Sequence, residues 1–231
     1  MNNIFQDQVT SCILALERAN HAMLKEILAR LPRMAPEVRP LPHVAAIPHP
    51  LNLNFTGREE LLTEVRRQLD ATGRTVLHGI GGVGKTQLAV QYAHRNAGRY
   101  GAILWIPAER DLSSAFLALA EQLGLPAQDA TKATQAVKGW LTKTENWLLV
   151  FDNATGPDEV RLFVPDAGRG HVLFTSRNPH WRLLKIDVPP VPLLTDEAAA
   201  AFLQDRTGRR EPGPALELAR DMGGLPLALE E

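Results

Sequence analysis

The feature that most constrains this 231-residue chain is a glycine-rich loop set between a short apolar run and a helix-forming run. The stretch VLHGIGGVGKTQLAV, residues 76–90, places four glycines within six positions and continues with Lys85 and Thr86. Glycine loses more backbone freedom on folding than any other residue, so a cluster of glycines indicates a need for bare backbone. We therefore expect backbone N–H groups to approach a ligand closely at this loop.

The loop matches the phosphate-binding pattern G-x-x-x-x-G-K-[ST] between Gly79 and Thr86. In this pattern, backbone N–H groups and the positive end of the following helix hold the phosphates of a nucleotide. Lys85 supplies a positive charge to the β- and γ-phosphates, and the Thr86 hydroxyl is a ligand for Mg²⁺. The loop residues expected to bind the nucleotide are Gly79, Gly81, Gly82, Val83, Gly84, Lys85, Thr86 and Gln87.

Two later apolar runs end in polar residues. The run NWLLVFDNA contains Asp152 near its end, and the run HVLFTSRN contains Arg177. Runs of this kind indicate parallel strands buried on both faces, and ligands bind beyond the carboxyl ends of such strands. We therefore expect Asp152 to hold Mg²⁺ opposite Thr86, and Arg177 to reach the γ-phosphate and report its presence.

Strand-like and helix-like segments alternate within residues 53–190, the expected nucleotide-binding domain. This alternation predicts an α/β fold, a parallel sheet with helices on both faces, as in the three-layer α/β/α P-loop NTPases. Beyond this region only helices are expected, so residues 191–231 are expected to begin an all-helical subdomain. The expected helices cover residues 60–70, 86–96, 113–124 and 134–143, and the expected strands cover 74–80, 101–108, 146–154, 171–178 and, more weakly, 183–189.

The segment before this region has two parts. Residues 1–31 are expected to include an amphipathic helix from residue 4, because apolar residues recur at spacings of three, four or seven up to Leu31. This helix is expected to mediate homo-oligomer formation, to be the tail of a preceding module, or to pack on its own domain. Residues 32–52 contain six prolines between Pro32 and Pro50, which favours an extended linker or an edge segment over a helix or a central strand.

Composition excludes several classes of protein. A formal net charge of -1 gives no electrostatic reason to expect nucleic acid or an anionic membrane as the main partner. The single cysteine, Cys12, excludes an intrachain disulfide and agrees with a reducing compartment. The N-terminal residues lack a basic signal region, and no run approaches the roughly 20 apolar residues of a membrane span. These features together predict a cytoplasmic protein.

Taken together, the motifs resemble those of the NB-ARC family of signal-transduction ATPases, which belong to the STAND class. Five motifs occur in the order typical of that family: FTGREELL at 55–62, GIGGVGKTQLA at 79–89, WLLVFDNA at 147–154, HVLFTSRN at 171–178 and GGLPLAL at 223–229. The resemblance covers about residues 53–231. The last motif is the most discriminating, because generic P-loop ATPases lack it.

The resemblance implies further roles. Phe55, Thr56 and Arg58 would lie beside the adenine and ribose of ATP or ADP, and Pro226 would pack on the adenine. The strand that ends at Arg177 would lie between the phosphate-loop strand and the Asp152 strand. Exchange of ADP for ATP would convert a closed form into an open form that oligomerises, and the protein would act in signalling or defence.

The chain departs from the family pattern at two points. Asn153 follows Asp152 where many members carry a second acid, and an amide cannot act as a general base, so hydrolysis is expected to be slow if it occurs. Asp158 and Glu159 are candidates to replace that acid. The chain also ends just after the GLPL motif, without the winged-helix and sensor domains of the family, which favours an excised fragment over a naturally short form.

Two other readings stay open at this level. The first is a P-loop ATPase or phosphotransferase in steady turnover on its own substrate, with Arg66–Arg67 or Arg209–Arg210 as candidate lid arginines. The second is a nucleic-acid-binding regulator, for which residues 1–54 offer no basic patch or helix-turn-helix pattern. In the leading reading, a nucleotide-dependent switch, the candidate catalytic residues are Lys85, Asp152 and Arg177.

Overall fold

The computed structural model describes residues 44–45, 47–209 and 211–230, which all lie in a unit that begins at Pro40. The expected N-terminal helix and most of the proline-rich segment lie outside the described residues. The centre of the described fold is a five-stranded parallel sheet in the order β1-β3-β4-β5-β2. The strands are β1 (Val44–Ala45), β2 (Arg74–His78), β3 (Ala102–Pro107), β4 (Glu145–Ala154) and β5 (Arg169–Ser176).

The strand order confirms the expectation drawn from the resemblance. β5, which ends before Arg177, pairs with β2 on one side and with β4 on the other. Since the strands are parallel, the phosphate loop after β2, Arg177 after β5 and Asp152 in β4 all meet at the carboxyl edge of the sheet. The two-residue β1 pairs with β3 at the outer edge of the sheet, where a strand flanked by prolines is tolerated.

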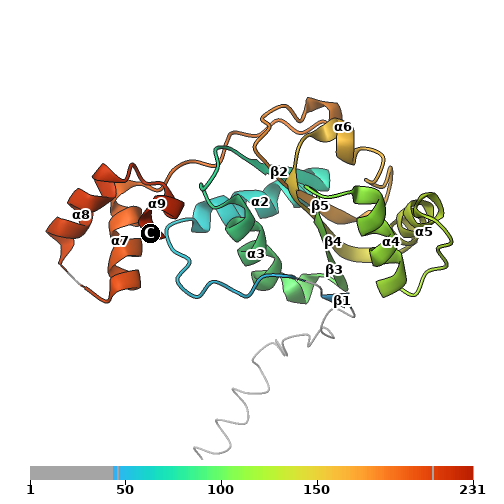
Figure 1. The fold of residues 1–231 in the computed structure, drawn as a ribbon, viewed down its shortest axis with the longest axis horizontal. Helices are drawn as coiled ribbons and strands as arrows, with labels where there is room; N and C mark the ends of the chain where they lie inside the picture. The colour runs from blue at the N-terminus through green and yellow to red at the C-terminus, as the bar shows by residue number, and fades with distance from the viewer. Residues whose placement is uncertain (1–43, 46, 210, 231) are drawn as a thin grey trace, which may run out of the picture. The chain divides into compact units, whose positions relative to one another are not determined.

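Successive residues of the central strands belong to two different cores. Leu148 and Val150 of β4 lie in a core with helices α2 (Glu59–Thr72) and α3 (Lys85–Arg95). Leu149 and Phe151 face the opposite core, which contains α4 (Leu112–Gln122) and α5 (Ala130–Lys143). Figure 1 shows the two pairs of helices on opposite sides of the sheet. The fully apolar strand sequences therefore reflect burial on both faces.

Capping residues mark several of the helix ends. The side chain of Asp111 accepts hydrogen bonds from the N–H groups of Ser113 and Ser114 at the start of α4, and Thr195 caps α7 (Asp196–Thr207) in the same way. Gly73 and Gly208 end α2 and α7 in the left-handed conformation. A short helix that the sequence did not predict, α6 (Pro157–Val160), follows β4.

One predicted strand is wrong. The segment 183–189 contains the end of a 3₁₀ turn, Arg182–Leu184, followed by irregular backbone. Lys185 adopts a left-handed φ of 59° and turns the chain out of an extended path. The segment returns to the sheet only as irregular chain: the N–H of Val191 donates to the carbonyl of His78 at 2.7 Å.

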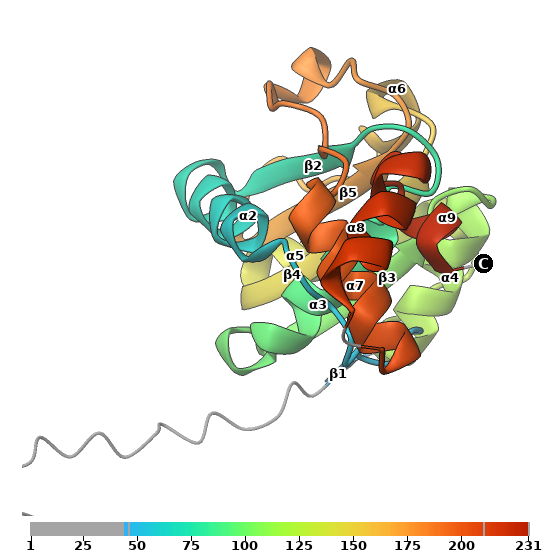
Figure 2. The ribbon, with the colours of Figure 1, turned by 90° about the vertical axis from the view of Figure 1, so that its left-hand side faces the viewer.

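Beyond this segment the structure is helical, as predicted. Helices α7, α8 (Pro212–Asp221) and α9 (Pro226–Glu230) share a small core that includes Phe202, Ala219 and Leu229, and Figure 2 shows the three helices grouped together. Among the described residues, no helix has the length and apolar character needed to cross a membrane.

Candidate functional site

The phosphate loop connects β2 to α3, as the spacing predicts. Lys85 is the first residue of α3, and its ammonium group donates to the carbonyls of Gly79 at 2.9 Å and Ile80 at 2.7 Å. Burial lowers the pKa of Lys85, and the nearby charge of Arg177 lowers it further, whereas Asp152 opposes the shift. A buried cation beside a second cation favours an anionic ligand between them.

Two glycines of the loop stand where a larger residue would not fit. Gly82 has a φ of 77°, and a Cβ at this position would lie 2.9 Å from the Cβ of Leu227. Gly84 has a φ of 90°, and its Cβ would lie 3.0 Å from an Nη1 atom of Arg58. The left-handed backbone and the close neighbours together require glycine at both positions. The N–H of Leu227 also donates to the carbonyl of Gly82 at 3.3 Å, so the start of α9 contacts the loop.

The predicted metal-binding pair is in direct contact. The hydroxyl of Thr86 donates to Oδ1 of Asp152 at 2.8 Å, although 66 residues separate them in the chain. The hydroxyl of Thr175 donates to the same oxygen at 2.6 Å and accepts from the backbone N–H of Asn153 at 2.8 Å. Two hydroxyls and one carboxylate thus form a compact set of hard oxygen atoms at the edge of the sheet.

The guanidinium of Arg177 lies over the phosphate loop at Gly81. A Cβ on Gly81 would be 3.6 Å from the guanidinium carbon of Arg177, so the arginine covers the bare backbone there. Together these groups surround a cavity of about 310 Å³. It is lined by Gly81, Gly82, Gly84, Lys85, Thr86, Gln87, Asn153, Thr175, Arg177, Pro226 and Leu227.

A second, smaller cavity adjoins the first, because Gly84, Gln87 and Pro226 line both. It measures about 60 Å³ and brings together Phe55, Thr56 and Arg58, the residues that the resemblance places beside the adenine and ribose. Arg58 is buried and its guanidinium is already engaged: Nη1 donates to the carbonyl of Val83 at 2.5 Å and Nη2 to that of Pro192 at 3.2 Å. Burial lowers the pKa of Arg58.

Of the loop residues predicted to bind nucleotide, two do not line either cavity. Gly79 contributes its carbonyl to Lys85. The side chain of Val83 is fully buried in the core of α2 and α3, and its carbonyl accepts from Arg58. These two residues therefore stabilise the conformation of the loop without lining either cavity.

The amino-acid sequence of this chain matches the family model "NB-ARC domain" over residues 58–211, which is more than half of the length of the chain. The chain belongs to the NB-ARC family. This assignment agrees with the site geometry, since an NB-ARC domain is a nucleotide-binding P-loop domain, and it confirms the resemblance drawn from the five motifs.

The relatives of this NB-ARC chain include fungal, bacterial and plant proteins. It is 25% identical over 222 residues to a "Nucleotide-binding leucine-rich repeat (NLR)-like protein" of Hyaloscypha variabilis, covering 80% of this chain and 22% of that protein. It is 28% identical over 219 residues to an uncharacterized protein of Mycobacterium tuberculosis, covering 82% of this chain and 53% of that protein. The chain therefore spans about half or less of the length of these relatives.

A solved structure confirms the fold. The STAND protein with a tetratricopeptide repeat sensor from Pyrococcus horikoshii is 21% identical to this chain and aligns with a TM-score of 0.55. The alignment covers 78% of this chain and 30% of the archaeal protein.

The structure of the NB-ARC chain places one further residue, which the sequence analysis did not identify, beside Asn153 of the cavity lining. The side-chain N–H of Asn153 donates to Oε2 of Glu109 at 2.5 Å. Glu109 follows β3, so the rule that polar residues gather after parallel strands would have marked it. Its distance from the recognised motifs along the chain left it unnoticed.

The other candidates named from the sequence have different partners. The hydroxyl of Thr155 donates to Glu159 within the turn that begins α6, and Asp158 is exposed in the same helix. Arg67 makes two hydrogen bonds to Glu64 on the outer surface of α2, and Arg66 lies 3.8 Å from Asp70. The structure gives Arg66 and Arg67 the environment of solvated helix residues.

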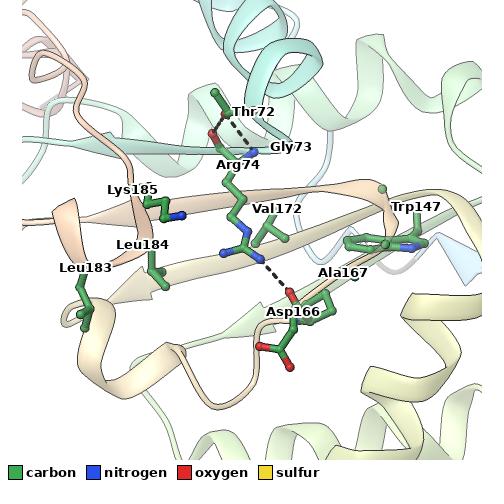
Figure 3. Close-up of a pocket in the computed structure, with 13 residues that line it drawn as sticks. Thr72, Gly73, Arg74, Trp147, Asp166, Ala167, Val172, Leu183, Leu184 and Lys185 are labelled. Carbon is green, nitrogen blue, oxygen red and sulfur yellow. Dashed lines mark hydrogen bonds between the residues drawn. The ribbon is translucent and has the colours of Figure 1, made fainter.

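A larger cavity, of about 520 Å³, lies at the opposite edge of the NB-ARC sheet. Figure 3 shows its lining, with Trp147 near the start of β4 and Arg74 at the start of β2. The guanidinium of Arg74 donates to the carbonyl of Pro165 at 2.7 Å. No residue predicted for the nucleotide site lines this cavity, and the amino edge of a parallel sheet is not where ligands of such folds bind.

Proposed function

We propose that this chain is the ATP- and ADP-binding core of a molecular switch that controls signalling or defence through conformational change and oligomerisation. The observation that carries the proposal is the single cavity formed by Lys85, Thr86, Arg177 and the start of α9. It brings phosphate-binding groups of the sheet domain against a helix of the C-terminal helical region. A ligand in this cavity therefore contacts both parts at once.

The oxygen atoms present fit Mg²⁺. This ion is usually bound by one or two protein side chains, with phosphate oxygens and water completing its shell. The Thr86 hydroxyl and the Asp152 carboxylate, 2.8 Å apart, supply such a pair. When bound with ATP, the ion would neutralise charge on the phosphates, and Lys85 and Arg177 would hold the same phosphates from the other side.

Switching is supported by the contact between α9 and the phosphate loop. The N–H of Leu227 donates to the carbonyl of Gly82, and the Gly82 Cα faces the Leu227 side chain with no room for a methyl group. A phosphate that moves the loop would alter this contact. A ligand shifts a conformational equilibrium only through different contacts in the two states. A γ-phosphate held by Arg177 would provide such a difference between ATP and ADP.

The first experiment is to denature the purified chain and identify any nucleotide that it releases, with the Lys85→Ala variant prepared in parallel. We expect close to one adenine nucleotide per wild-type chain and little in the variant, because a charged partner of the phosphates is lost. A wild-type chain that is empty and also fails to bind added Mg-ATP would contradict the proposal.

Hydrogen exchange of residues 223–229 tests the switching part. The segment should exchange at different rates with ADP and with a non-hydrolysable ATP analogue, and the analogue should also change the apparent mass in gel filtration. Equal exchange and equal mass with both nucleotides would limit the function to nucleotide binding. Release of phosphate from many ATP molecules per chain would favour the alternative, an ATPase or phosphotransferase in steady turnover.

A further inference from the structure

The structure places a carboxylate beside the one position at which this chain lacks the expected acid. Asn153 lines the 310 Å³ cavity next to Asp152, where an acid would otherwise polarise the water that attacks the γ-phosphate. Asp152 is assigned to the metal-binding pair with Thr86, and its Oδ1 accepts from both Thr86 and Thr175. The site therefore needs another proton acceptor if ATP is hydrolysed there.

The pairing of β3 with β4, one backbone hydrogen bond and one side-chain hydrogen bond hold Glu109 beside Asn153. Pro107, the last residue of β3, is in register with Asp152 on the neighbouring strand β4. The N–H of Ala108 then donates to the carbonyl of Asp152 at 2.7 Å, which pins the chain as it leaves β3. Glu109 is the next residue, and its Oε2 accepts from the Asn153 amide at 2.5 Å.

The backbone of Asn153 directs its side chain across the sheet edge toward Glu109. The pairing of β4 with β5 is irregular between Phe151 and Ala154, and Asn153 has a left-handed φ of 62°. Irregularities of this kind turn side chains at the edges of sheets, and Asn and Asp tolerate left-handed backbone better than most residues. The Thr175 hydroxyl accepts from the N–H of Asn153 and fixes the irregular turn.

We infer that Glu109 is the catalytic base for ATP hydrolysis in this chain and that Asn153 is the residue that positions it. This inference rests on the proposed nucleotide-binding function. One bond from Asn153 leaves other lone pairs of the Glu109 carboxylate for a water molecule. Glu109 and Asn153 are both exposed, so water from solvent reaches the pair.

The reaction balances with water as the only co-substrate. The water oxygen attacks the γ-phosphorus, its proton passes to the Glu109 carboxylate, and the bond to the β,γ-bridging oxygen breaks. ADP leaves with the electron pair of that bond, and inorganic phosphate is released. The proton on Glu109 returns to solvent, which restores the base for the next turnover.

The test measures ATP affinity and single-turnover hydrolysis separately, using the full 231-residue chain in excess over labelled Mg-ATP. Glu109→Gln should lower the hydrolysis rate by about 100-fold or more while leaving ATP affinity unchanged. Asp158→Asn changes an exposed acid of α6 in the same way and should leave the rate unchanged. Asn153→Gly keeps the left-handed backbone without strain and should lower the rate but not the affinity.

The double variant Glu109→Gln, Asn153→Asp separates a chemical role from a structural one. Asp is tolerated in left-handed backbone, and it places a carboxylate on the cavity, so roughly tenfold or more of the lost rate should return. A Glu109→Gln variant that hydrolyses ATP at the wild-type rate would overturn the inference, as would a wild-type chain that binds ATP but does not hydrolyse it. A wild-type chain that binds no ATP would instead overturn the proposed function, and this inference with it.

Discussion

The buried side chain of Arg58 offers a sharp test of what holds the phosphate loop against the chain that leads to α7. Its guanidinium makes two hydrogen bonds, one to the carbonyl of Val83 in the loop and one to the carbonyl of Pro192. Only 8% of the residue is exposed. Replacing Arg58 with alanine removes both bonds and leaves two carbonyls to find other partners.

The size of the effect follows from these contacts. A hydrogen bond from a charged donor contributes about 1.5–3 kcal/mol to stability, so two such bonds are worth at most about 6 kcal/mol. Burial penalises the charge of Arg58, as the lowered pKa shows, and water can reach part of the exposed loop. We therefore expect Arg58→Ala to lower the free energy of unfolding by about 3 kcal/mol.

Arg67→Ala is the matched control. Arg67 stands on the same helix, α2, and also makes two hydrogen bonds, at 2.7 and 2.6 Å, to Glu64. Its side chain is 68% exposed, so solvent screens the pair and its loss should lower the free energy of unfolding far less than the loss of Arg58 does. Urea unfolding of both variants measures the difference. Equal losses in the two variants would refute the reasoning that burial decides the worth of these bonds.

Three further predictions concern residues outside the nucleotide site. A Cβ on Gly170 would lie 2.1 Å from the ring of Trp147, so Gly170→Ala should lower the free energy of unfolding by about 3 kcal/mol without changing ATP affinity. Gly139 lies in the interior of α5, where an added Cβ meets nothing within 4 Å, so Gly139→Ala should raise the free energy of unfolding by about 0.5–1 kcal/mol. Denaturant unfolding measures both variants, and a change of the same sign in the two would refute the packing argument. Burial lowers the pKa of His171, with Arg99 adding to the shift and Asp70 opposing it. Near the ordinary pKa of histidine, the unfolded chain therefore binds more protons at this residue than the native chain does. Stability should then fall as pH drops through about 6.5, and unfolding measured between pH 7.5 and 5.5 should show a smaller fall for His171→Gln; parallel curves for the two proteins would contradict this.

Much of the site was predictable because its chemistry is concentrated in short stretches of sequence. The phosphate loop, Asp152 and Arg177 each follow an apolar run that forms a buried strand, and parallel strands bring their carboxyl ends to one edge. The resemblance to NB-ARC proteins supplied the order of these strands, which the structure confirms. The wrong strand at 183–189 has apolar residues at suitable positions, but Lys185 turns the backbone out of an extended path.

The sequence by itself predicted the buried parallel strands, most of the helices and the position of the phosphate-binding loop. These properties depend on spacing along the chain, because strand and helix periodicities and the phosphate-loop pattern are local. Only the tertiary structure decided that Arg58 reaches Val83 and Pro192, that Leu227 contacts Gly82, and that Asn153 contacts Glu109. These contacts join distant segments, so they depend on strand register, a local irregularity in β4 and the packing of helices, which no local pattern encodes.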